Sequence, residues 1–287
     1  MKILITGANG QLGQEFQKIF RKKGIEVIET DVLGSAHTLD ITNLDEIRTF
    51  VKKNPVELII NCAAYNAVDK AETDWYNAYL INGIGTRNLA LVSNEIKTPF
   101  IHYSTDAIFD GKKGAPYTIL DKPNPISKYG ESKLLGEFYT QQIAKKFYLI
   151  RTSWLFGIGS INFVKKVLKW SSNNNNLKIV DDKFSTPTYT VDLAKATLDL
   201  IQTNAFGLYH ITNSGFCSRY EWADYILREI RWEGKLSRVK SDEFDLPAQR
   251  PDYSVLDNFG TKETINYLLP DWKNATNRYL SQIDTDI

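Results

Sequence analysis

The chain of 287 residues is poor in the side chains that build disulfide frameworks and zinc sites. It has two cysteines, Cys62 and Cys217, and three histidines, His37, His102 and His210, all scattered along the sequence. Two isolated cysteines make no disulfide framework, and none of these residues has the spacing of zinc ligands. The sequence therefore excludes a small disulfide-stapled protein and a zinc-ribbon protein, and it favours a reducing cytoplasm.

The chain also lacks an excess of one charge and a long apolar run. Its 35 Lys and Arg residues and 34 Asp and Glu residues leave a net charge of +1. A nucleic-acid-binding protein needs a basic face, and a membrane helix needs a run of about 18 apolar residues, which does not occur here. Met1 leads directly into an apolar stretch, which leaves no room for a signal peptide. We therefore expect a cytoplasmic protein whose partners include neither nucleic acid nor a membrane.

A glycine pattern at the start of the chain gives the first positive signal. Lys2–Thr6 has the pattern of a short buried strand, and Gln14–Lys23 that of an amphipathic helix. Between them Gly7, Gly10 and Gly13 follow the spacing G-x-x-G-x-x-G. Strand, glycine turn and helix together are typical of a site for a dinucleotide pyrophosphate, which the N–H groups of the helix N-terminus bind. A glycine-rich turn without a ligand is the alternative, and the flanking strand and helix disfavour it.

Two acidic residues further on bear on the adenosine end of such a cofactor. Ile25–Glu29 predicts a second strand, and Asp31 lies just past its end. A carboxylate about 20 residues beyond the glycines usually accepts from the ribose hydroxyls and repels the extra phosphate of NADP, which favours NAD(H). A solvated aspartate at a strand end is the alternative. Asp40 and Ile41 either lie against adenine or Asp40 caps a helix that starts near Asn43, and the two roles are compatible.

Two further strands are predicted to end beside this site. Glu57–Asn61 has the pattern of a buried parallel strand, and the small residues in the turn at 62–65 leave room for a ligand at the sheet's carboxyl edge. Small residues also permit close packing, which is the alternative. Phe100–Tyr103 predicts the next strand, and the hydroxyl residues Ser104 and Thr105 follow it.

The strongest chemical signal is a tyrosine and a lysine in the stretch PISKYGESK. Tyr129 and Lys133 are four residues apart, so on a helix they share a face. The pKa of a free tyrosine is about 10, and a neighbouring ammonium would lower it. A hydroxyl from Ser104 or Thr105 would hold a substrate oxygen beside the phenol. These groups together predict a general acid for carbonyl reduction. A surface pair on a helix is the alternative.

Strand and helix patterns continue through the second half of the chain without a repeat or a linker. They cover Phe147–Arg151, Ile161–Trp170, Leu177–Asp181, Thr190–Ile201, Leu208–Thr212 and Arg219–Ile230. We expect an α/β protein with a doubly wound parallel Rossmann sheet and a small C-terminal α/β lobe. The Rossmann domain is predicted over residues 1–152 with later segments returning to it. The substrate-binding lobe is predicted mainly over residues 153–287, interleaved with it.

The chain resembles the extended short-chain dehydrogenases/reductases and, more narrowly, the dTDP-4-dehydrorhamnose reductase family. The matching stretches span nearly the whole chain and read ITGANGQLGQE, NCAAYNAVDKAE, STDAIFDG, NPISKYGESKLLGE, IRTSWLFG, RPDYSVLDN and LPDW. The resemblance implies NAD(P)H-dependent reduction of the C4 keto group of dTDP-4-dehydro-L-rhamnose. NADH is the expected cofactor, with NADPH also allowed. The expected partner is a small-molecule nucleotide sugar, and a homodimer is allowed.

The resemblance also implies roles for the matching residues. It assigns Gly10, Gln11 and Leu12 to the cofactor's pyrophosphate and Asp31 to its adenosine ribose. Asp40 and Ile41 would contact the adenine. The cofactor's path would be lined by Ala63, Ala64 and Tyr65. Tyr129 would donate the proton, and Lys133 would be its partner and bond the nicotinamide ribose. Thr105 and Asp106 would contact the sugar. Trp154 would lie nearby, although taken by itself it fits a core position equally well.

Three other positions bear on ligands. Some family members bind Mg²⁺ between subunits through carboxylates, and the resemblance allows Glu15 as one of these carboxylates. Lys195 stands where a further carboxylate would help, so no metal is expected. Ala107 follows Asp106 where the family usually has an aromatic residue. Arg250 lies in a breaker-rich loop, where it either reaches a nucleotide diphosphate or is solvated.

Two alternative functions remain open. A related nucleotide-sugar epimerase or dehydratase would use the same fold, but a dehydratase normally has an acidic pair beside its hydroxyl residue. Thr105, Asp106 and Ala107 supply only one carboxylate. A non-catalytic nucleotide-binding regulatory subunit tends to lose the tyrosine or the lysine, and both are present here.

Overall fold

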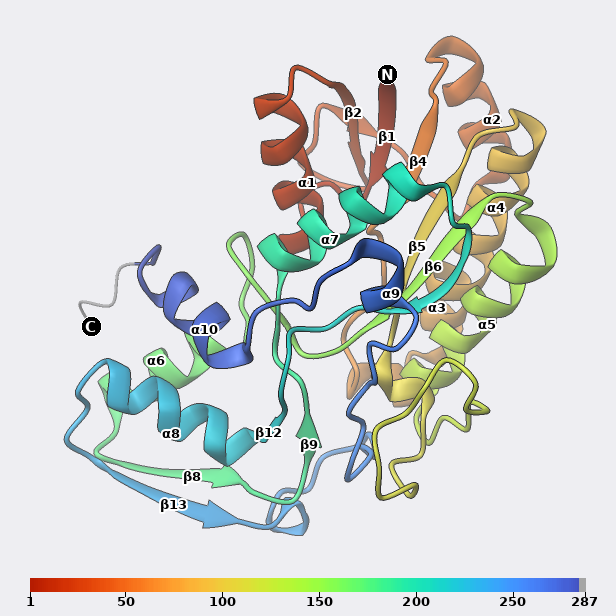
Figure 1. The fold of residues 1–287 in the computed structure, drawn as a ribbon. Helices are drawn as coiled ribbons and strands as arrows, with labels where there is room; N and C mark the ends of the chain where they lie inside the picture. The colour runs from red at the N-terminus through yellow and green to blue at the C-terminus, as the bar shows by residue number, and fades with distance from the viewer. Residues whose placement is uncertain (284–287) are drawn as a thin grey trace.

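The computed structural model describes residues 1–283, and a seven-stranded parallel sheet forms its centre (Figure 1). The strand order is β11-β6-β5-β4-β1-β2-β3. The strands are β1 (Lys2–Thr6), β2 (Glu26–Asp31), β3 (His37–Thr38), β4 (Leu58–Asn61), β5 (Phe100–Thr105), β6 (Phe147–Thr152) and β11 (Gly207–His210). The order runs outward in opposite directions from β1 and β4, which creates the crevice where open α/β sheets bind ligands. The predicted α/β Rossmann fold is confirmed.

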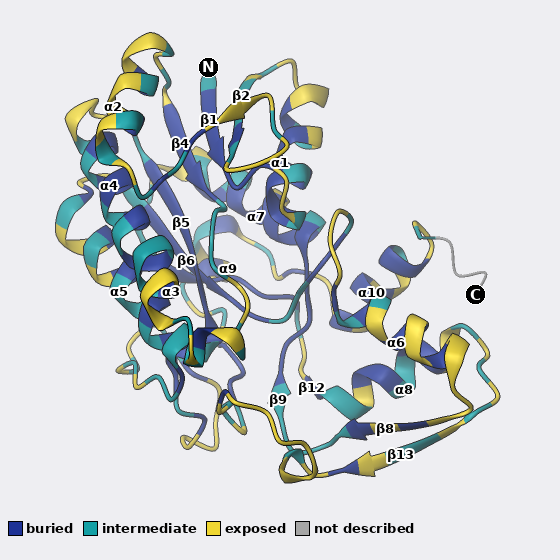
Figure 2. Ribbon diagram, turned by 180° about the vertical axis from the view of Figure 1, so that it is seen from behind, coloured by how far each residue is buried: buried dark blue, intermediate teal, exposed yellow. Residues whose placement is uncertain are grey.

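Helices cover both faces of this sheet, because parallel strands need crossover connections. One face carries α1 (Gln11–Lys22), α7 (Thr190–Thr203) and α9 (Thr261–Ile265). The other carries α2 (Leu44–Lys53), α3 (Trp75–Tyr79), the π-helical turn Leu80–Gly85, α4 (Thr86–Glu95) and α5 (Lys128–Ile143). The strands between them are largely buried, as Figure 2 shows. No helix within residues 1–283 is long and apolar enough to cross a membrane.

A smaller lobe with its own core lies beside the carboxyl edge of the sheet (Figure 1). Its main elements are α6 (Phe163–Asn173), β8 (Asn176–Val180), α8 (Arg219–Glu229), β13 (Lys235–Val239) and α10 (Trp272–Leu280). Two short strand pairs link it to the sheet, β7 (Leu155–Phe156) with β10 (Thr188–Tyr189), and β9 (Phe184–Ser185) with β12 (Cys217–Ser218). The chain leaves the lobe at α7 and β11, which complete the large sheet, and then returns to it.

Several element boundaries differ from the sequence-based expectations by a few residues, and two of these differences and one cap assignment concern the site. Helix α1 begins at Gln11, three residues before the predicted start, with Gly10 as its N-cap. Strand β5 extends to Thr105 instead of ending at Tyr103. The proposal that Asp40 caps α2 is wrong, because the Oδ1 of Asn43 accepts from the Glu46 N–H at 3.2 Å. The Asp40 carboxylate instead accepts from the backbone and hydroxyl of Thr42, each at 2.8 Å.

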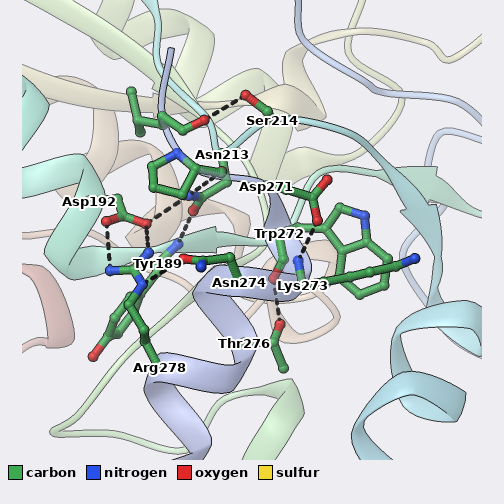
Figure 3. A network of polar contacts seen from close by, with 12 residues as sticks. Tyr189, Asp192, Asn213, Ser214, Asp271, Trp272, Lys273, Asn274, Thr276 and Arg278 are labelled. Carbon is green, nitrogen blue, oxygen red and sulfur yellow. Dashed lines mark hydrogen bonds and ion pairs between the residues drawn. The ribbon is translucent and has the colours of Figure 1, made fainter. Parts of the chain in front are cut away.

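A polar network joins α10 to α7 and to the loop after β11 (Figure 3). The Asp192 carboxylate accepts from two nitrogens of Arg278, at 2.9 and 2.5 Å, and from the Asn213 amide at 2.7 Å. The Asn213 Oδ1 in turn accepts from the Tyr189 N–H at 2.8 Å. This network fixes the lobe against the large sheet at the point where the chain passes between them.

A fully buried ion pair holds α5 against β6. The Glu137 carboxylate accepts from Nε and Nη2 of Arg151 at 3.0 and 2.7 Å, and the two side chains are 0% and 3% exposed. The Arg151 guanidinium also lies 5.3 Å from the Phe109 ring and 3.3 Å from Nε2 of His210. Since each ion satisfies the other out of water, removal of one leaves an uncompensated buried charge.

We therefore predict that Glu137→Gln lowers the free energy of unfolding by about 3–5 kcal/mol. Glu95→Gln is the matched control, because Glu95 forms a similar pair with Arg48 on the surface, where both side chains are more than 40% exposed. This control should cost at most about 1 kcal/mol. Urea denaturation of both variants measures the difference, and equal small losses would contradict the assigned role of the buried pair.

Candidate active site

A cavity of about 400 Å³ opens at the carboxyl ends of β1, β2 and β4. This volume lies within the usual range for small-molecule sites. The residues predicted to bind the cofactor that line it are Gly7, Gly10, Asp31, Asp40, Ile41, Ala63 and Ala64. The structure therefore brings together residues from four separate stretches of the chain, as expected for a ligand in the crevice of the sheet.

Two glycines are required because backbone segments approach closely here. Gly7 has φ +68°, and a Cβ on it would lie 2.4 Å from the backbone nitrogen of Ala63. A Cβ on Gly13 would lie 2.5 Å from the Gly7 carbonyl oxygen. Any side chain at either position would push β1 away from β4 or α1 away from the turn. The backbone of the turn and the start of α1 are consequently open to an anion, as in a dinucleotide site.

Asp31 is the last residue of β2 and faces the same cavity. Its carboxylate accepts from the Asn9 N–H at 3.1 Å and from the Val32 N–H at 2.8 Å. These bonds fix the carboxylate at the rim and leave it further lone pairs for hydroxyl donors. No lysine or arginine of the described chain lines this cavity.

Six of the residues predicted to contact the cofactor do not line the cavity: Gln11, Leu12, Gly13, Tyr65, Tyr129 and Lys133. Gln11 accepts a hydrogen bond from the Asn162 amide at 3.2 Å, and Leu12 is buried in the core between α1 and the sheet. The Tyr65 hydroxyl donates to the Asp74 carboxylate at 2.9 Å. Their side chains are thus engaged with the protein, and only the backbone N–H groups of Gln11 and Leu12 remain to face a pyrophosphate.

The N-terminal turns of α5 bring the predicted catalytic residues to the end of β5. Ser127 caps this helix, its hydroxyl accepting from the Gly130 N–H at 3.1 Å. Lys133 is 3% exposed, and its Nζ donates to the Tyr103 carbonyl oxygen at 2.6 Å. The Thr105 side chain lies close enough to the Tyr129 phenol to lower its pKa. The hydroxyl of Ser104 is buried and has no partner within residues 1–283, so Thr105 is the hydroxyl beside the phenol.

The charges at this site correct one prediction. The pKa of Tyr129 is raised to about 12, mainly by burial. The neighbouring Thr105 side chain opposes this increase, and the Asp106 carboxylate adds to it. Burial lowers the pKa of Lys133 to about 8, against the opposing effect of Glu137. The prediction that Lys133 lowers the pKa of the phenol is therefore wrong, because burial dominates and the ammonium is directed at the Tyr103 carbonyl. The phenol stays protonated, which suits a proton donor.

Asp106 links the large sheet to the lobe. Its Oδ2 accepts from the hydroxyls of Ser185 and Ser254 at 2.8 and 2.5 Å, and its Oδ1 from Thr105 at 3.1 Å. The carboxylate is buried, and burial raises its pKa. A sugar hydroxyl could donate a hydrogen bond to this carboxylate only by replacing one of the three hydroxyls of the chain that already do so.

Trp154 lies over an arginine that the sequence analysis missed. Its backbone has φ +41°, and its ring is stacked on that of Trp222, with the centroids 6.0 Å apart. The Cζ of Arg219 lies 3.5 Å from the centroid of the Trp154 ring. No local pattern marked Arg219, because its aromatic neighbours come from separate elements. Trp154 is therefore a half-buried residue that packs between the Trp222 ring and the Arg219 guanidinium.

Arg250 is held by an ion pair with Asp69. Its Nη1 and Nη2 donate to the two oxygens of Asp69 at 2.9 and 2.7 Å. Asp69 lies in the segment that follows β4, so this pair connects a lobe loop to the large sheet's edge. The side chain is neither freely solvated nor far from the site.

Glu15, the carboxylate considered for Mg²⁺, and Asp192, which lies on the same helix as Lys195, both interact with cations of the chain. Glu15 lies 3.4 Å from the Lys18 ammonium, and Asp192 is bonded to Arg278. Within residues 1–283, no group of three or more His, Cys, Asp or Glu side chains has the arrangement of a metal site. These residues do not fit the metal that the resemblance allowed, and no step below uses one.

We predict that Gly7→Ala weakens NAD(P)H binding and destabilises the fold, because the new Cβ would meet the Ala63 backbone. Gly24→Ala is the matched control, since Gly24 has a similar φ of +66° but a Cβ on it would have no atom within 4 Å. Fluorescence titration with NAD(P)H and urea denaturation measure both effects. The control should bind normally and lose about 1 kcal/mol or less, and identical behaviour of the two variants would refute the close-approach argument.

Comparisons with known proteins agree with this geometry. Residues 1–285 match the family model described as RmlD substrate binding domain. Spore coat polysaccharide biosynthesis protein SpsK of Bacillus subtilis (strain 168) is 37% identical over 281 residues, which cover 98% of this chain and 97% of that protein. A dTDP-4-dehydrorhamnose reductase structure from Clostridium acetobutylicum ATCC 824 has a TM-score of 0.94 and 42% identity, and covers 98% of this chain and 99% of that one.

A second structure, of dTDP-4-dehydrorhamnose reductase from Bacillus anthracis str. Ames in complex with NADP, also has a TM-score of 0.94. It is 33% identical, and the match covers 98% of this chain and 99% of that one. The likeness extends through both the large sheet and the lobe. The resemblance predicted from the motifs is confirmed: the chain belongs to the RmlD substrate binding domain family.

Proposed function

We propose that the protein reduces the C4 keto group of dTDP-4-dehydro-L-rhamnose to give dTDP-L-rhamnose, with NAD(P)H as cofactor. One observation carries this proposal: the glycine-lined cavity and the Tyr129–Thr105 pair both lie at the carboxyl edge of one sheet. The similarity to dTDP-4-dehydrorhamnose reductases over 98% of the chain supports the choice of substrate.

The cofactor is proposed to lie along the cavity, where it would supply the hydride. The turn at Gly7 and Gly10 and the first N–H groups of α1 face the pyrophosphate. Asp31 accepts from the adenosine ribose, and Asp40 and Ile41 lie beside adenine. NADH is the proposed cofactor, because Asp31 lines the cavity and no cation of the described chain does. NADPH is the alternative, which the NADP complex of the Bacillus anthracis relative supports.

The reaction needs a proton at the oxygen of the carbonyl that is reduced. Tyr129 holds that proton at neutral pH, because burial raises its pKa to about 12. In the proposed complex the Thr105 hydroxyl, which donates to Asp106 at 3.1 Å in this structure, turns to donate to the substrate oxygen next to the phenol. The Lys133 ammonium, fixed by the Tyr103 carbonyl, provides positive charge as the oxygen becomes negative. Proton donation and charge stabilisation together supply general-acid catalysis without a metal.

We propose that one part of the fold binds the cofactor and the other binds the substrate. Residues 1–152, completed by α7 and β11, form the cofactor domain, and the rest of residues 153–287 forms mainly the substrate lobe. The last four of these, 284–287, lie outside the described residues. A dehydratase is disfavoured, because the one carboxylate beside Thr105 is occupied by three hydroxyls.

We predict that Tyr129→Phe lowers kcat for dTDP-4-dehydro-L-rhamnose by about 100- to 10,000-fold, because the proton donor is lost. NAD(P)H binding should persist, since the cavity residues are untouched. Tyr139→Phe, on the same helix but outside the site, is the control and should retain activity. NADH consumption measures the rates, and full activity of Tyr129→Phe would remove the phenol from the mechanism.

The pKa of Lys133 leads us to predict a specific pH dependence of kcat/KM. With a pKa of about 8, its side chain is charged at lower pH and neutral at higher pH. The charged form stabilises the developing negative oxygen, so kcat/KM should fall as the pH rises through about 8. The same profile for Lys133→Met should be lower and should lack this decline. A wild-type profile that shows no decline above neutral pH would contradict the role of the ammonium.

A further inference from the structure

The loop at 157–162, between β7 and α6, projects from the lobe toward α1 (Figures 1 and 2). Its tip is exposed, and Ile161 there is 76% accessible to solvent. Its two ends, Gly157 and Asn162, are buried. The loop thus carries a buried polar side chain from the lobe to the helix whose start borders the cofactor cavity.

Asn162 connects three helices through one amide. Its Oδ1 accepts from the Lys165 N–H at 3.2 Å and so caps α6. Its Nδ2 donates to the Gly157 carbonyl oxygen at 2.8 Å and to the Tyr279 hydroxyl on α10 at 2.9 Å. The same Nδ2 donates to Oε1 of Gln11, the first residue of α1, at 3.2 Å. Two of these acceptors lie in the lobe, and the third belongs to the large sheet's cofactor helix.

A second contact of the same loop reaches the glycine turn. Gly159 has φ +111°, and a Cβ on it would lie 2.7 Å from Oε1 of Gln14. The Gln14 side chain is itself fixed, because its Nε2 donates to the Asn9 carbonyl oxygen at 2.7 Å. Asn9 lies in the glycine turn, and its N–H donates to the Asp31 carboxylate at 3.1 Å. The loop therefore packs on side chains that support the cofactor turn.

The start of α1 has free N–H groups and one nearby side chain that could compete for them. Its N-cap is Gly10, which has no side chain, and its first turn contains no acidic residue. These N–H groups are consequently available to a pyrophosphate. A glutamine in the first turn of a helix can bond such groups with its side-chain oxygen, as in a capping box. In this structure the Gln11 oxygen accepts from Asn162 instead.

We propose that Asn162 is a positioning residue for the cofactor: it holds the side-chain oxygen of Gln11 away from the free N–H groups of α1 and so keeps them open to the pyrophosphate of NAD(P)H. A residue of the substrate lobe thereby contributes to cofactor affinity through Gln11. The inference rests on the proposed function for the place of the cofactor, and it does not depend on which keto sugar is reduced.

Fluorescence titration of the full-length protein with NAD(P)H tests this role. Asn162→Ser keeps a good N-cap for α6 but removes the amide that reaches Gln11. It should weaken NAD(P)H binding by about 3- to 10-fold, the range expected for one hydrogen bond. Asn43→Ser is the matched control, because Asn43 caps α2 through a bond of the same length, 3.2 Å, and is exposed. This control should bind NAD(P)H like the wild type.

The same substitution in a second background separates positioning from a structural role. In a chain that carries Gln11→Ala there is no side-chain oxygen left to hold. Asn162→Ser should therefore change the affinity for NAD(P)H by less than about twofold relative to Gln11→Ala alone. If Asn162 only stabilises the lobe, the loss should be the same in both backgrounds. Asn162→Thr, which also caps α6 and lacks the amide, replaces Asn162→Ser if urea denaturation shows that variant to be unfolded.

The outcomes separate this inference from the proposed reaction, because the titrations contain no sugar. Wild-type affinity of Asn162→Ser for NAD(P)H would overturn the inference, and so would equal losses in the two backgrounds, even if the protein reduces the keto sugar. A loss that disappears with Gln11→Ala would support the inference, even if the protein does not reduce that sugar.

Discussion

The hydrogen bond from Lys133 to the Tyr103 carbonyl is the constraint on which the site depends. At 2.6 Å it joins α5 to the end of β5, and it does so from a fully buried position. Tyr129, Lys133 and Glu137 follow one another at intervals of four, so one face of α5 carries the phenol, the ammonium and the carboxylate. Glu137 fastens the same helix to β6 through Arg151. The phenol is thereby held next to Thr105 by two contacts to neighbouring strands.

Burial of these groups explains their protonation. The same desolvation that raises the pKa of Tyr129 lowers the pKa values of Lys133 and His102. The phenol and the imidazole are therefore neutral at pH 7, and Lys133 carries the positive charge opposite Glu137. Glu137 is already paired with the buried Arg151, so Lys133 relies on the Tyr103 carbonyl as its acceptor. The site can then respond to a negative oxygen without a rearrangement of the protein.

The sequence predicted those features of the fold and site that depend on local spacing. Strand and helix periodicity identified the sheet, and the glycine spacing located the cavity, because both patterns lie within one stretch of chain. The i, i+4 spacing placed Tyr129 and Lys133 on one face. It did not show that the ammonium would be directed at the Tyr103 carbonyl, since the acceptor lies 30 residues away.

Contacts between distant parts of the chain were not predictable in this way. The Arg250–Asp69 pair spans 181 positions, and the Ser254 hydroxyl on Asp106 spans 148. The aromatic rings around Arg219 come from the segment after β6, from α6 and from α8. Such contacts arise only when the lobe folds onto the sheet, and no single stretch carries their pattern. For this reason the residues around the cavity were largely predicted, whereas the contacts between the lobe and the sheet were found only in the structure.

The destination of the hydride tests the central claim most directly. The protein would be incubated with NADH that carries deuterium at the transferable C4 position and with dTDP-4-dehydro-L-rhamnose, and the sugar product examined by NMR. If Tyr129, Thr105 and Lys133 position a C4 carbonyl at the end of the cofactor cavity, one deuterium appears at C4 of the product sugar. A product without deuterium, or with deuterium at another carbon, would contradict the account.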